Sequence, residues 1–124
     1  MHPEHKMQTD QAIKAFSQSE KLKTGLIWGN QIVEAYVALP EHEKPGAERI
    51  LKILVGMIAS EIHIAKNAAP HDKWLEAEKD LSTAQVMLNS GAGHDTGHHL
   101  TQALSKITTI GQQAMSLLVE QKLL

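Results

Sequence analysis

Proline and glycine gather at three places in this sequence and divide it into four segments. The clusters lie at residues 40–46, at Pro70 and at residues 90–93. Both residue types are typical of turns and helix ends, because proline lacks an amide hydrogen and glycine adopts conformations that other residues avoid. Each segment between them repeats apolar residues every three or four positions, the spacing of an amphipathic helix. The sequence therefore predicts helices at about 9–39, 47–69, 71–90 and 95–122.

Four helices joined by short connections are typical of an all-α, four-helix up-and-down antiparallel bundle. The 124 residues are a common size for one domain, so we expect a single helical-bundle domain over 1–124. The first and fourth helices should be the longest. In this topology the start of the first and the end of the fourth lie at the same end of the bundle, so both should extend in one direction. Those extensions could pair with each other or with a second subunit.

Charge and composition exclude several classes of function. The net charge is −2 and Arg49 is the only arginine, so we expect no nucleic-acid partner. Cysteine is absent, which excludes disulfides, thiolate metal sites and a thiol nucleophile. No run approaches the ~20 apolar residues of a membrane span, and residues 1–6 are too polar for a signal peptide. The sequence thus predicts a cytoplasmic protein without a membrane span.

Histidine is unusually frequent, with eight copies. In an antiparallel bundle the first connection and the start of the fourth helix lie at the same end. His94 and His98 are four residues apart, which can place two ligand atoms on one side of a helix. A zinc, nickel or iron site there would use His42, His94, His98 and His99. That site is the alternative; we expect a solvated helix start capped by Asp95, with no cofactor.

No catalytic motif is present, so we do not expect an enzyme. The chain contains neither a G-x-S-x-G elbow nor a phosphate-binding glycine loop. A di-iron bundle would need inward Glu-x-x-His pairs, and none occurs. Glu61 lies near an apolar stripe, where a carboxylate should keep its charge in water or pair with Lys or Asn. A deep polar pocket holding a carboxylate or histidine would instead favour an enzyme.

The apolar residues exceed what four helices of this length need for a core. Those of the second segment form a stripe so wide that we expect this helix to be the most deeply buried and some apolar area to remain for a partner. In the first segment, two glycines beside Trp28 indicate either a closely packed neighbour or a bend. The candidate interaction surface comprises Gly25, Trp28, Gly29 and Ile32. Dimerisation through the second helix is the alternative.

The function expected from the sequence is therefore a binding or interaction module that contacts another protein or self-associates as a homodimer. The alternative is a metal-binding or metal-sensing bundle that uses the histidine-rich end.

Overall fold

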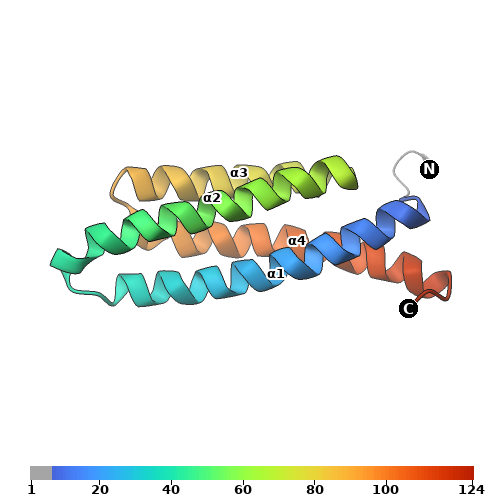
Figure 1. Ribbon diagram of the computed structural model, residues 1–124, viewed down its shortest axis with the longest axis horizontal. Coiled ribbons are helices and arrows are strands. Elements are labelled where there is room, and N and C mark those ends of the chain that lie inside the picture. Colours follow the sequence, from blue (N-terminus) through green and yellow to red (C-terminus); the bar gives the residue numbers. More distant parts are fainter. Residues whose placement is uncertain (1–6) are drawn as a thin grey trace.

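The computed structural model describes residues 7–124, which form a bundle of four long helices, each antiparallel to the next (Figure 1). Each helix packs against the next in sequence, and α1 also packs along α4. The described residues contain no strand, so the predicted all-α four-helix bundle is confirmed. The elements are α1 (Thr9–Val37), η2 (Glu41–Glu43), α2 (Lys44–Ala68), α3 (Asp72–Asn89), η3 (Gly93–Asp95) and α4 (Thr96–Glu120), where η marks a short 3-10 helix.

The helix ends lie within three residues of their predicted positions. The largest difference is at α2, which begins at Lys44 rather than at residue 47. Pro45 lies in its first turn, where the missing amide hydrogen costs nothing because no partner exists for it there. α1 is one continuous helix through Gly25 and Gly29, so the bend considered for that region does not break it.

The core runs along the centre of the bundle and is almost entirely aliphatic. Each of the four helices contributes fully buried side chains to the core, for example Leu26, Val55, Leu81 and Ile107. Trp74 is also fully buried, and its Nε1 donates a hydrogen bond of 2.7 Å to the carbonyl oxygen of Ala69. This bond ties the start of α3 to the end of α2, so the short α2–α3 connection is held from inside.

Two glycines mark places where the backbone is closely approached. A Cβ added at Gly111 on α4 would lie 2.6 Å from the Ser19 hydroxyl on α1, and one added at Gly93 would lie 2.5 Å from the Tyr36 hydroxyl. Neither distance leaves room for a methyl group. At Gly25 an added Cβ would meet nothing within 4 Å, so no neighbouring helix approaches there.

α1 is the longest helix, with 29 residues, but α4 has 25, the same as α2, so the prediction that the fourth helix is longer than the second is wrong. α1 and α4 nevertheless overhang at one end of the bundle. Figure 1 shows the start of α1 and the end of α4 projecting together beyond the α2–α3 connection. There the Thr9 hydroxyl donates a hydrogen bond to the side-chain oxygen of Gln121. The two extensions therefore pair with each other. Among the described residues, no helix is long and apolar enough to cross a membrane.

Candidate interaction surface

The four candidate metal ligands lie on three elements. His42 is in η2, His94 is in η3, and His98 and His99 are in the first turn of α4. The rings of His98 and His99 pack edge to face with centroids 5.2 Å apart, and His98 Nε2 lies 3.2 Å from Gln102 Nε2. Within residues 7–124, no group of three or more His, Cys, Asp or Glu side chains is arranged to hold a metal ion. The structure thus does not bring these histidines into one coordination site.

A recess of about 450 Å³ lies beside Tyr36, between the end of α1, the start of α2 and the α3–α4 connection. The Tyr36 hydroxyl donates a hydrogen bond of 2.9 Å to the Glu48 carboxylate. Burial, together with this bond to an anion, raises the pKa of Tyr36 to about 12. The phenol is therefore neutral at physiological pH and joins two helices. Sequence periodicity missed this pair, because the pairing depends on how α1 and α2 align.

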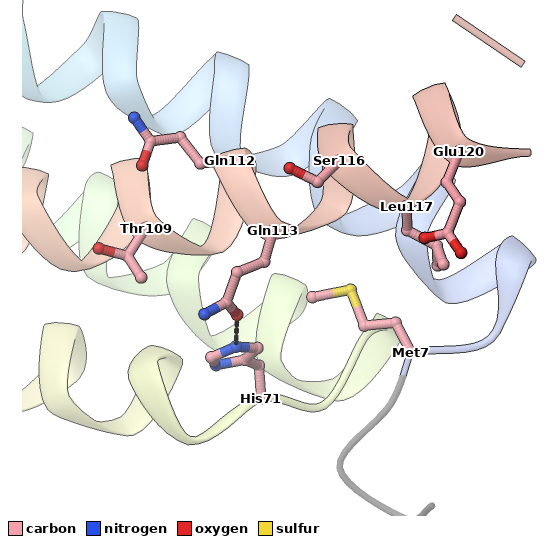
Figure 2. Close-up of a pocket in the computed structure, with 8 residues that line it drawn as sticks. All are labelled: Met7, His71, Thr109, Gln112, Gln113, Ser116, Leu117 and Glu120. Carbon is pink, nitrogen blue, oxygen red and sulfur yellow. Dashed lines mark hydrogen bonds between the residues drawn. The ribbon is translucent and has the colours of Figure 1, made fainter. Parts of the chain in front are cut away.

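A second recess, of about 550 Å³, lies under the overhang, where α4 extends past the start of α3 (Figure 2). Gln113 reaches from α4 to His71, and its Oε1 lies 2.6 Å from the ring Nε2. The other ring nitrogen, Nδ1, accepts a hydrogen bond of 3.0 Å from the Lys73 amide and so caps α3. These contacts assign the ring proton to Nε2. The recess is lined by Met7, His71, Thr109, Gln112, Gln113, Ser116, Leu117 and Glu120.

Both ring nitrogens of His71 are thus engaged in structural hydrogen bonds. Among the described residues, the rest of the lining is chiefly amide, hydroxyl and apolar groups, with Glu120 as the one carboxylate. General acid or base catalysis needs a titratable group whose proton can reach a substrate. The hydrogen bonds of His71 favour a capping role over a catalytic one.

Ion pairs join neighbouring helices at the surface. Glu78 on α3 accepts a hydrogen bond of 2.7 Å from Lys66 on α2, and His63 Nδ1 lies 3.2 Å from its other oxygen. The bond from Lys66 is the main cause that lowers the pKa of Glu78, and it outweighs the opposing effect of burial. Glu61 pairs with Lys21 across α1 and α2 at 3.0 Å. The carboxylate singled out in the sequence is therefore bonded to a lysine, as expected.

Large apolar side chains are exposed on two neighbouring helices, and we name this surface the α1/α2 apolar face. Trp28 is 63% exposed and Met57 is 61% exposed. The ion pair between Lys21 and Glu61 lies at the surface, where α1 and α2 meet. Trp28 is two helical turns from Lys21 on the same side of α1, and Met57 is one turn from Glu61 on the same side of α2. Both therefore lie on the same side of the bundle. The face comprises Trp28 and Ile32 on α1 and Ile50, Ile53, Met57 and Ile64 on α2.

The four residues that the sequence proposed as an interaction surface differ in their exposure to solvent. Trp28 and Ile32 are exposed, and Gly25 is partly exposed. Gly29 is buried instead, and a Cβ there would meet Leu54 and Ile58 of α2 and Leu100 of α4 at 3.6 to 3.9 Å. Gly29 thus belongs to the core and is excluded from the face. The sequence indicated the second helix only as an alternative surface and named none of its residues, although the spacing of three, four and seven among them was visible.

Comparisons with protein families, curated proteins and solved structures found nothing that matches this chain.

Proposed function

We propose that this protein is an interaction module that binds another protein through the α1/α2 apolar face. The main support for this proposal is the large apolar area that the α1/α2 apolar face exposes to solvent. At roughly 150 to 250 Å² for a large side chain when fully exposed, the six residues expose on the order of 600 Å². The largest apolar patch of a typical monomer measures about 300 to 600 Å² and is often functional. The face is therefore at the upper end of that range.

The composition of the face supports the same proposal. Tryptophan and methionine are enriched at protein interfaces, and tryptophan is among the residues whose truncation most often weakens binding. Lys21 and Glu61 lie at the edge and already neutralise each other, so a partner that covers this edge need not supply a charge. The face thus combines an apolar centre with a satisfied polar edge.

The spacing of the apolar residues indicates the shape of the partner. Ile50, Ile53 and Met57 follow each other at intervals of three and four residues, so they form a straight ridge along α2. Such ridges pack best against another helix, whose side chains fit between them. We therefore expect a helical surface as the partner.

Photo-crosslinking tests this function. A photoreactive amino acid replaces Met57 in one variant and Val86 on α3 in the other, and both are illuminated in a lysate of the source organism. Val86 is the matched control because it is 59% exposed and lies outside the α1/α2 apolar face. We expect discrete protein adducts from position 57 and only background from position 86. Equal yields at the two positions would contradict the proposal.

A further inference from the structure

We propose that the partner is a second copy of this chain, docked with its α2 antiparallel to the first α2 and with a two-fold axis beside Met57 and Trp28. This inference rests on the proposed function and names what covers the α1/α2 apolar face. The commonest soluble oligomers are two-fold dimers, in which one patch must be complementary to itself. The α1/α2 apolar face satisfies that requirement in area and in pattern.

The area fits a dimer. A standard protein interface buries about 800 Å² on each partner. The six residues of the face supply most of that value, and neighbouring partly exposed residues such as Gly25 extend it. A second copy contributes an equal area, so both faces would be covered in a single contact.

The two ends of the ridge on α2 are symmetric about Met57, whereas the position that mirrors Ile53 is Glu61. Ile50 and Ile64 lie seven residues before and after it, which is two turns, or about 10.5 Å, in each direction. When two α2 helices run antiparallel with their Met57 residues opposed, Ile50 of each copy meets Ile64 of the other. Both ends of the ridge then find an apolar partner, and Ile53 lies opposite Glu61, whose charge is already paired with Lys21.

The other simple two-fold arrangement places α1 of one copy over α2 of the second. Lys21 on α1 lies at the level of Glu61, close to Ile64, because the two side chains are hydrogen-bonded. In that arrangement Ile64 would face the region of Lys21 and press a charged group against an apolar side chain. Burying a charge that way is unfavourable. Both arrangements set an apolar residue against the Lys21–Glu61 pair, but only α2 against α2 also matches Ile50 with Ile64, so the pattern favours α2 against α2.

α1 supports the same axis. Gly29, the residue after Trp28, packs against Leu54 and Ile58, which places Trp28 at the level of Met57. An axis that crosses both helices at this level brings the Trp28 side chains of the two copies near the centre of the interface. The centre is where the residues that dominate binding are usually found.

Site-directed cross-linking tests the arrangement, and the chain is well suited to it because it has no cysteine. Ile50→Cys and Ile64→Cys variants are mixed and treated with a short bismaleimide, and each variant is also treated alone. We expect the mixed pair and Met57→Cys alone to give cross-linked dimers, with the mixed yield at least about tenfold above that of Ile50→Cys alone. Val86→Cys is the control and should give no cross-linked dimer.

Sedimentation of the unmodified chain separates this inference from the proposed function. We expect a dimer at tens of micromolar, and Trp28→Glu should raise the dissociation constant at least about tenfold while the helical circular dichroism is retained. A folded monomer at that concentration would overturn self-association, yet the adducts at position 57 could still support binding of a different protein. A dimer in which Ile50→Cys links efficiently to itself would overturn the antiparallel arrangement.

Discussion

The Tyr36 hydroxyl donates a hydrogen bond to the Glu48 carboxylate and so joins the last turn of α1 to the first part of α2. The ring also occupies the space that a side chain at Gly93 would need. One tyrosine thus fixes three segments at the end of the bundle opposite the overhang.

Alkaline titration should report this pair directly, because Tyr36 is the only tyrosine. Its pKa is raised to about 12, so its contribution to folding is complete below the ordinary value of 10 and is lost as the pH rises from about 10 to about 12. We expect phenolate absorbance and the loss of helical circular dichroism to rise together in that window. In Glu48→Gln the midpoint should fall but stay above 10, because burial is the larger cause. An unchanged midpoint would show that the carboxylate contributes nothing.

Glu78 should make the bundle sensitive to acid. Its folded pKa lies below the ordinary 4.5, so the stability it contributes is present above that pH and is lost as the pH falls through the folded value. We expect Glu78→Gln to lower the unfolding free energy by about 1 kcal/mol at neutral pH, and by less in acid, in urea titrations. Glu76→Gln is the control, because the Glu76 pairing with Lys73 is exposed and lies within one helix. Equal losses for the two variants would contradict this role.

Two glycine-to-alanine substitutions should have opposite effects. Gly111→Ala places a methyl group against Ser19 and should lower the unfolding free energy by about 1 to 3 kcal/mol. Gly25→Ala meets open space in a helix interior and should raise it by up to about 1 kcal/mol. Thermal melts at a low protein concentration, at which the proposed dimer would dissociate, provide the comparison. A stabilising Gly111→Ala would mean that α1 and α4 separate there without cost.

His71 should act as a helix cap. His71→Ala removes the acceptor for the Lys73 amide and should cost about 1 kcal/mol of unfolding free energy. His71→Asn restores a side chain that caps well, although it loses the bond to Gln113, so it should recover most of that loss. Urea unfolding of the three proteins checks this order. Equal losses for Ala and Asn would assign the effect to Gln113 instead.

The fold could be predicted because its determinants are local. Proline and glycine indicate where the connections lie, and the spacing of apolar residues indicates the helices. The sequence alone therefore predicts the four-helix bundle. The start of α2 was misplaced because Pro45 was interpreted as a breaker, although proline is compatible with a first helical turn. Tyr36 and Glu48 could not be paired in advance, since nothing in the sequence fixes the alignment of two helices.

The prediction that the second helix is the most deeply buried is wrong, for a related reason. Its apolar residues form two stripes: Leu51, Val55, Ile58, Ile62 and Ala65 are buried, whereas Ile50, Ile53, Met57 and Ile64 are exposed. Periodicity shows that both stripes exist but not which one faces the core. Among the glycines, Gly25 and Gly29 drew attention through their spacing beside Trp28. The tight contacts are instead at Gly93 and Gly111, where the helix arrangement decides.

The packing of α1 along α4 has a consequence for the newly made chain. α1 is synthesised before α4, so Gly29, for example, cannot reach Leu100 until α4 has left the ribosome. Contacts between segments far apart in sequence form late and leave apolar surface uncovered until then. Until α4 is available, the apolar residues of the first three helices that will pack against it stay exposed to water. A chaperone could bind this exposed surface during that time.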